Sequence, residues 1–128
     1  MAAILIVDDE PSVRTFLGLL FSDDGYEVRV AAHGQQALEM VGKEVPDVVL
    51  SDIMMPIVGG AELCRRLKGA PATAGVPVIL MSGGPSPPDL GGADAYISKP
   101  FELVEMEALV RRCLSDVKRE VGQRWTTG

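Results

Sequence analysis

The strongest constraint on the fold is a set of short aliphatic runs separated by segments with helical spacing. Nearly continuous aliphatic runs occupy residues 3–7, 48–50 and 76–81, and more polar runs occupy residues 26–32 and 93–98. Aliphatic runs of this length, rich in branched side chains, are typical of strands buried on both faces of a parallel sheet. Each of the five runs is therefore predicted to be a strand.

The segments between the strands carry the periodicity of amphipathic helices. Helical patterns follow Pro11, recur at residues 35–44 and 61–68, and begin again near residue 102. In the first of them, five apolar residues recur on one face and are predicted to be buried: Val13, Phe16, Leu17, Leu20 and Phe21. Strands that alternate with helices predict right-handed βαβ units and a parallel sheet. The fold class is α/β, a single three-layer domain.

Length and charge exclude several classes of protein. A chain of 128 residues is the size of one ordinary domain. Its net charge of −6 argues against sequence-independent binding to nucleic acid. No apolar run reaches the length of a membrane span, and the first residues show no signal-peptide pattern. We therefore expect a cytoplasmic protein that contacts neither nucleic acid directly nor a membrane.

Polar side chains stand where four of the five strands end. They are Asp8 and Asp9 after the first strand, Asp52 after the third, Ser82 after the fourth and Lys99 after the fifth. Taken singly, each has an ordinary explanation as a helix cap, a turn residue or a solvated charge. The carboxyl ends of parallel strands meet at one edge of a sheet, so the coincidence predicts a shared site.

The chemistry of this set favours a phosphoryl group. Three carboxylates in one pocket repel one another, and Mg²⁺ relieves that repulsion while keeping water and phosphate oxygens as further ligands. A hydroxyl and an ammonium group suit the remaining oxygens of a phosphoryl group. An aspartate carboxylate can itself attack phosphorus to form an acyl phosphate. The set therefore predicts phosphorylation of Asp52.

Three motifs closely resemble those of the response-regulator receiver domain of two-component signalling. They are ILIVDDEP at residues 4–11, DVVLSDIMMP at residues 47–56 and YISKPF at residues 96–101. The resemblance covers nearly the whole chain and implies a flavodoxin-like sheet of strand order 2-1-3-4-5. It assigns residues 1–118 to the receiver domain and leaves residues 119–128 as a C-terminal tail or linker stub.

The resemblance also implies a role for each site residue. Asp52 would be the phospho-acceptor, and Mg²⁺ would be held by Asp8, Asp9, Asp52 and the backbone carbonyl of Met54. Such domains accept the phosphoryl group from a sensor histidine kinase or a phosphotransfer protein. They then act on a downstream protein or an output domain. Apart from self-catalysed phosphotransfer and autodephosphorylation, no enzymatic activity is expected.

The same resemblance implies a switch next to the phosphorylation site. Lys99 would pair with the phosphoryl oxygens, and the peptide between Lys99 and Pro100 would be cis. Ser82 matches the hydroxyl that moves toward the phosphoryl group. Tyr96 matches the aromatic side chain whose inward or outward rotamer reports activation.

The chain departs from the family pattern in two places. Gly59 replaces an acidic residue in the turn after Pro56, a change that is expected to leave the chemistry intact. The segment between Ser82 and Tyr96 is roughly five residues shorter than the pattern, which is more than one turn of helix. Residues 83–92 are mostly glycine and proline. The family's fourth helix is therefore expected to be missing or vestigial, which alters the dimerisation and output face.

Two other functions remain open at this point. The missing helix is compatible with a receiver-like binding module that works without phosphorylation. A phosphatase with an aspartate nucleophile is less favoured, because such enzymes carry a second aspartate two residues after the nucleophile. Met54 occupies that position here and cannot protonate a leaving group.

Overall fold

Five parallel strands form one sheet at the centre of the molecule. The computed structural model describes residues 1–84 and 89–127, with side chains described as far as residue 116. The sheet has the order β2-β1-β3-β4-β5, so the predicted α/β class and strand order are confirmed. The strands are β1 (Ala3–Val7), β2 (Glu27–Ala31), β3 (Val48–Asp52), β4 (Val78–Ser82) and β5 (Ala95–Ser98).

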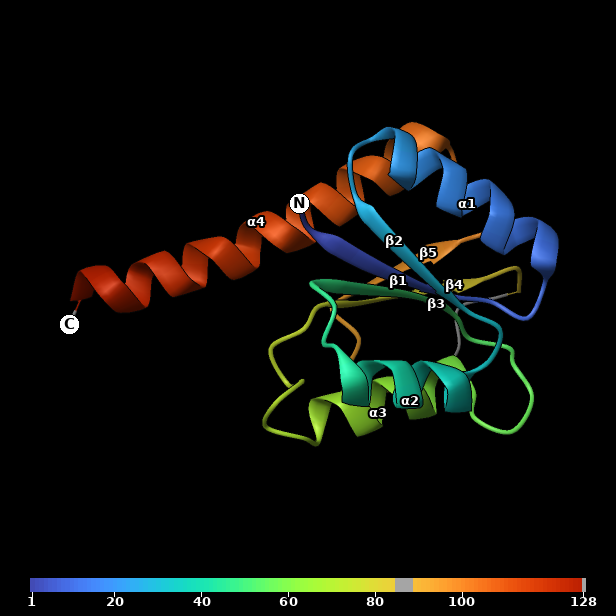
Figure 1. Cartoon of the computed structure of the whole chain (residues 1–128), viewed down its shortest axis with the longest axis horizontal. Coiled ribbons are helices and arrows are strands. Elements are labelled where there is room, and N and C mark those ends of the chain that lie inside the picture. Colours follow the sequence, from blue (N-terminus) through green and yellow to red (C-terminus); the bar gives the residue numbers. More distant parts are fainter. Residues whose placement is uncertain (85–88, 128) are drawn as a thin grey trace.

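Helices cover both faces of the sheet, giving three layers. Those of the described chain are α1 (Pro11–Asp23), α2 (Gly34–Lys43), α3 (Gly60–Lys68) and α4 (Leu103–Thr127). Helices α1 and α4 lie on one face, and α2 and α3 lie on the other (Figure 1). Residues 119–127 continue α4, and this end of the helix projects beyond the sheet (Figure 1). Within the described residues, none of the helices combines the length and apolar character needed to cross a membrane.

Alternation along the strands divides the core between the two faces. Ile4 and Ile6 of β1 point toward α1 and α4, while Leu5 and Val7 point toward α2 and α3. All five residues of β1, β3 and β4 are buried, as predicted for strands covered on both faces. The first core also contains Leu17, Phe21, Met106 and Val110, and the second contains Ala37, Val41, Leu63 and Leu67.

Helix α1 buries a narrower face than its sequence pattern predicts. Leu17 and Phe21 are buried, but Phe16 is 53% exposed, so the prediction that Phe16 is buried is wrong. Successive residues of a helix lie about 100° apart, so a residue next to Leu17 can lie at the edge of the contact with the sheet. Phe16 lies there with the exposed Leu19.

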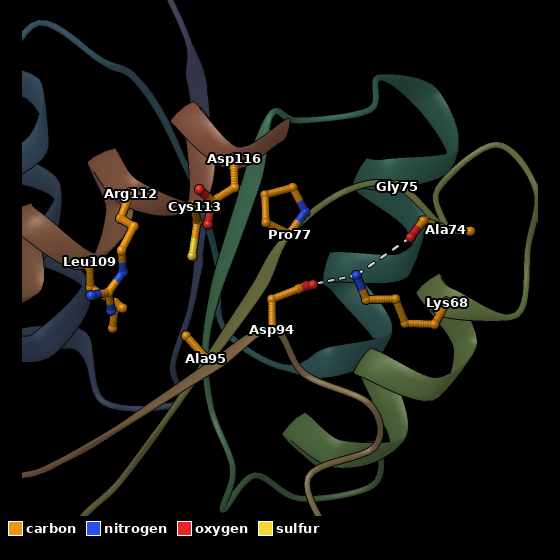
Figure 2. Close-up of a pocket in the computed structure, with 10 residues that line it drawn as sticks. All are labelled: Lys68, Ala74, Gly75, Pro77, Asp94, Ala95, Leu109, Arg112, Cys113 and Asp116. Atoms are coloured by element: carbon orange, nitrogen blue, oxygen red, sulfur yellow. Dashed lines mark hydrogen bonds and ion pairs between the residues drawn. The ribbon is translucent and has the colours of Figure 1, made fainter. Parts of the chain in front are cut away.

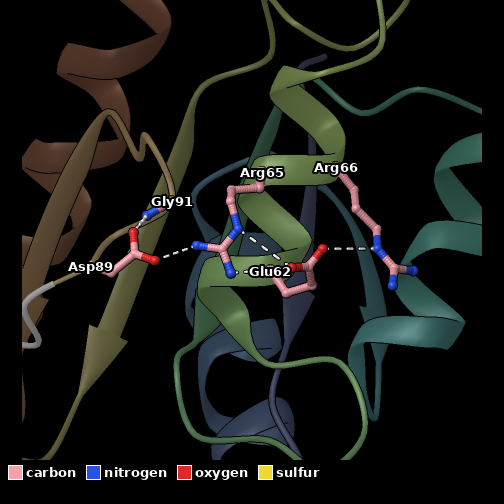
Figure 3. A network of polar contacts seen from close by, with 5 residues as sticks. All are labelled: Glu62, Arg65, Arg66, Asp89 and Gly91. Atoms are coloured by element: carbon pink, nitrogen blue, oxygen red, sulfur yellow. Dashed lines mark hydrogen bonds and ion pairs between the residues drawn. The ribbon is translucent and has the colours of Figure 1, made fainter.

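The connection between β4 and β5 contains no helix in its described part. Of residues 83–94, the structure describes 83–84 and 89–94, and none of these is helical. The predicted loss of the family's fourth helix is therefore confirmed for these residues. Asp89 and Gly91 of the connection lie beside α3 (Figure 3).

Two polar contacts hold this connection to α3. In the first, the Arg65 guanidinium of α3 forms ion pairs with Glu62 of the same helix and with Asp89 of the connection (Figure 3). The Asp89 carboxylate also accepts a hydrogen bond from the backbone N–H of Gly91 at 2.8 Å. Gly91 has φ +64°, and a Cβ atom there would clash with the backbone of α3. A glycine is required for so close an approach.

The second contact lies at the opposite end of the sheet. The Lys68 ammonium is 2.7 Å from an Asp94 carboxylate oxygen, and that oxygen also accepts the backbone N–H of Val78 at 2.7 Å. Lys68 and Asp94 line a cavity of about 300 Å³ that residues of α4 also line (Figure 2). The connection is thus fixed to α3 where it approaches β5, by hydrogen bonds that also fix the start of β4.

Candidate functional site

Neighbouring strands bring three carboxylates together at the carboxyl edge of the sheet. Asp52 is the last residue of β3, and Asp8 and Asp9 directly follow the adjacent strand β1. One oxygen from each of the three carboxylates lies within 4.8 Å of the others. Asp8 is completely buried, Asp52 is 7% exposed and Asp9 is exposed. The predicted convergence of these side chains is present in the structure.

Asp8 is held at each of its polar groups. Its Oδ1 accepts the backbone N–H of Glu10 at 2.9 Å, which turns the chain into α1. Its own N–H donates to the carbonyl of Ala31 at 3.2 Å, and its carbonyl accepts a hydrogen bond from Arg14 Nη1 at 2.7 Å. A buried carboxylate needs such partners, because an unpaired one would lose its hydration without replacement.

Lys99 reaches the carboxylates from the end of the edge strand β5. It follows β5, and its backbone N–H donates to the carbonyl of Ser82 at 2.7 Å. Its ammonium nitrogen is 3.4 Å from Asp8 Oδ2 and 3.9 Å from Asp52 Oδ2. The peptide between Lys99 and Pro100 is cis, as the family resemblance implied. One cation therefore faces two of the three acids.

These groups surround an open pocket of about 540 Å³. Ser82 lies in its wall and is buried, and its Oγ accepts the backbone N–H of Gly84 at 3.2 Å. The Met54 side chain is exposed at the rim. The lining residues are Asp9, Glu10, Asp52, Ile53, Met54, Ser82, Gly83, Gly84 and Lys99.

Tyr96 lies apart from this pocket. It is partly buried and packs against the core on the face of the sheet that α2 and α3 cover. Its hydroxyl is buried and has no hydrogen-bond partner among the residues that the structure describes. The tyrosine that the family resemblance assigned to the switch is therefore partly buried on the edge strand β5, outside the lining of the pocket, and its role in a switch stays a prediction.

The surroundings of Asp52 disfavour its ionised form. Burial raises the pKa of the Asp52 carboxyl above its ordinary value, and the nearby charges of Asp8 and Asp9 raise it further. The Lys99 ammonium and the backbone N–H of Met54 lower the pKa but do not offset the burial. A negative charge that its surroundings disfavour is one that a bound cation would stabilise.

We expect Asp52→Asn to raise the free energy of unfolding at neutral pH in the presence of a chelator. A carboxyl whose pKa is higher in the folded state favours folding when protonated, and this contribution is lost as the pH rises through the folded pKa. The advantage of the asparagine variant should therefore be largest at neutral pH and vanish below about pH 4. Urea denaturation across this pH range measures it, and a less stable variant at neutral pH would contradict the electrostatic interpretation.

The donor set fits a hard divalent cation. Mg²⁺ binds carboxylate oxygens and keeps several waters, and three carboxylate oxygens within 4.8 Å of one another, beside a pocket, meet that requirement. Asp9 and Asp52 border the pocket, whereas Asp8 lies behind them. The Met54 carbonyl as a further ligand stays a prediction.

Two charged residues at the site were not predicted from the sequence. Glu10 lines the pocket, and Arg14 hydrogen-bonds the backbone that joins β1 to Asp9. The only signal for either was proximity, because Glu10 follows the Asp-Asp pair and Arg14 lies in the first turn of the next helix. Proximity in sequence does not show that a helical arginine folds back over a strand end.

Comparisons with known proteins identify the family. The model of the response regulator receiver domain matches residues 4–111 of this chain. The chain is 35% identical over 130 residues to the DNA-binding response regulator MtrA of Mycolicibacterium smegmatis, covering 98% of this chain and 56% of MtrA. It thus spans about half the length of the curated relatives it matches.

Solved structures agree with the sequence comparison. The signal receiver domain of a histidine kinase from Syntrophus aciditrophicus has a TM-score of 0.87 and 36% identity, covering 93% of this chain and 94% of that chain. The receiver domain of a sensor histidine kinase from Pseudomonas aeruginosa PAO1, solved with a magnesium ion coordinated in its active site cleft, has the same fold, with a TM-score of 0.83 at 24% identity and coverage of 89% and 98%. Together with the site described above, these matches show that the chain belongs to the receiver domain family of two-component response regulators.

Proposed function

We propose that this chain accepts a phosphoryl group on Asp52 from a histidine kinase or a phosphotransfer protein. The observation that carries the proposal is the arrangement of two further acids, a hydroxyl and an ammonium around the Asp52 carboxylate, at the edge of one open pocket. No structural role requires all of these groups in one place. A nucleophile, a charge partner and a metal-ligand set are what phosphoryl transfer to an aspartate needs.

Each side chain has a distinct part in the proposed transfer. An Asp52 oxygen attacks phosphorus, and the bond from phosphorus to the donor nitrogen breaks with its electron pair remaining on the nitrogen. The Lys99 ammonium offsets the charge on the phosphoryl oxygens, and the Ser82 hydroxyl donates a hydrogen bond to one of them. Water later hydrolyses the acyl phosphate, so the only catalysis proposed is on the chain's own phosphoryl group.

The proposed cofactor is Mg²⁺. Asp8, Asp9, Asp52 and the Met54 backbone carbonyl would hold it. When bound, the ion would offset the negative charges of the carboxylates and of the phosphoryl oxygens. The magnesium ion coordinated in the active site cleft of the Pseudomonas aeruginosa receiver domain supports this choice of metal.

The proposed output is a protein contact. MtrA is named as a DNA-binding regulator, but this chain spans 56% of its length. The chain carries a net charge of −6, which disfavours direct binding to the phosphate backbone of DNA. We therefore propose that the phosphorylated chain acts on a downstream protein or an output domain.

The full chain incubated with acetyl phosphate and Mg²⁺ should gain one phosphoryl group, seen as a single adduct by intact mass spectrometry. Without Mg²⁺, in the presence of a chelator, the adduct should be absent or strongly reduced. The reason is that the single Lys99 ammonium is not enough to neutralise three clustered carboxylates as an anionic donor approaches. Circular dichroism would establish that the chain is folded under both conditions.

A second candidate function is a binding module that works without phosphorylation. The absence of a helix in the described part of the β4–β5 connection favours it, because the family's usual output face is reduced. A folded, Mg²⁺-saturated chain that forms no adduct would favour this candidate over the phospho-acceptor. A phosphatase remains disfavoured, since the exposed Met54 side chain offers no acid at the pocket rim.

A further inference from the structure

Arg14 supports the backbone from which the metal-ligand set extends. It lies in the first turn of α1, and its Nη1 donates a 2.7 Å hydrogen bond to the carbonyl oxygen of Asp8 in a partly buried position. In the described part of the chain, Arg14 has no carboxylate partner within ion-pair distance. Its principal contact is therefore with a backbone carbonyl at the end of β1.

This contact bears directly on the direction of Asp9. The Asp8 carbonyl and the Asp9 nitrogen belong to one planar peptide group, so holding the carbonyl oxygen sets the orientation of that plane. Within the described residues, the Asp9 carboxylate accepts no hydrogen bond of its own, while Asp8 has partners for its side chain and its N–H. The backbone therefore sets the direction of the Asp9 Cα–Cβ bond, and among the described residues no hydrogen bond constrains the carboxylate further.

We propose that Arg14 is a positioning residue for the binding of Mg²⁺. By holding the Asp8–Asp9 peptide, it directs Asp9 toward the pocket and so strengthens Mg²⁺ binding. This inference rests on the proposed function. The guanidinium also carries a positive charge near the site, and that charge by itself opposes the binding of a cation. Positioning and repulsion therefore change Mg²⁺ affinity in opposite directions when the arginine is removed.

The test is a Mg²⁺ titration of the full chain, followed by amide chemical shifts in NMR spectra and without any phosphoryl donor. Arg14→Met keeps the length and helix propensity of the side chain but removes its donors and its charge. We expect Mg²⁺ binding about tenfold weaker than in the wild-type chain, the size of effect seen when a group that orients a metal ligand is lost. Arg14→Lys, which keeps a donor, should recover part of the loss.

Arg29→Met is the matched control. Arg29 is likewise partly buried and donates to a backbone carbonyl, that of Glu44 at 3.3 Å. Unlike Arg14, it also forms ion pairs with Glu27 and Glu44, and none of these residues lines the pocket. Its removal should leave Mg²⁺ affinity unchanged even if it lowers stability.

Three outcomes would overturn the inference. Unchanged Mg²⁺ affinity in folded Arg14→Met would mean that the arginine only stabilises the fold, and tighter binding would mean that repulsion outweighs positioning. A lysine variant that binds no better than the methionine variant would exclude the hydrogen bond as the cause. If the wild-type chain itself fails to bind Mg²⁺, the proposed metal site is wrong, which is a different result from a failure of Arg14 alone.

Discussion

A chain carrying Asp52→Ala should gain no phosphoryl group from acetyl phosphate under conditions that label the wild-type chain completely. Asp52 ends the strand beneath the pocket, and its carboxylate lies 3.9 Å from the Lys99 ammonium nitrogen. Alanine has no oxygen that can attack phosphorus. Intact mass spectrometry with Mg²⁺ present measures the loss. It should be complete, because Asp8 is buried behind the pocket and the Lys99 ammonium pairs with Asp8 and Asp52 but not with Asp9 or Glu10 of the pocket lining.

Glu10→Gln provides the control for this experiment. Glu10 lines the same pocket but is not one of the three clustered acids, so its replacement should leave a single adduct. Both variants should first be shown to unfold cooperatively. Labelling of Asp52→Ala at the wild-type level would show that another residue accepts the phosphoryl group.

Phe21→Ala should lower the free energy of unfolding by about 3–5 kcal/mol. The Phe21 side chain is completely buried, and its ring meets that of Tyr26 edge to face, with centroids 5.6 Å apart. Truncation would remove these contacts and leave a cavity between α1 and the sheet. Urea denaturation measures the change. Phe21→Leu, a smaller truncation, should lose less and provides a measurement if the alanine variant does not fold.

Phe16→Ala is the comparison within the same helix. Phe16 is 53% exposed, and its truncation should cost less than about 1 kcal/mol. Equal losses for the two phenylalanines would contradict the burial described for α1.

The strands were predictable because a strand that is buried on both faces appears in the sequence as a short, nearly continuous aliphatic run. The predicted bounds of β1 agree with the structure, and the run at residues 76–81 contains most of β4, which extends to Ser82. Phe16 shows where this reasoning stops. A period of 3.6 residues identifies the apolar side of a helix, but not how wide a strip of that side the sheet covers.

The site was predictable where strand ends alone placed its residues. Asp52, Ser82 and Lys99 lie at the pocket because parallel strands share a carboxyl edge. The hydrogen bond of Arg14 and the packing of Tyr96 against the α2–α3 side of the core could not be predicted in this way. The first depends on how a helix folds back over a strand end, and the second on which side of the edge strand a ring is packed.

The contact between Lys99 and Asp8 spans 91 residues of sequence. During synthesis, both aspartates of the first loop and Asp52 emerge long before the lysine that faces them. Until β5 joins the edge of the sheet, the carboxylates have neither this counter-charge nor the lysine that completes the lining of the pocket. Contacts between distant residues also form late in folding, since closing a long loop costs entropy before the contact is gained. On the proposed function, only a chain whose whole sheet has been assembled presents the complete acceptor site, because the lysine of that site arrives with the last strand.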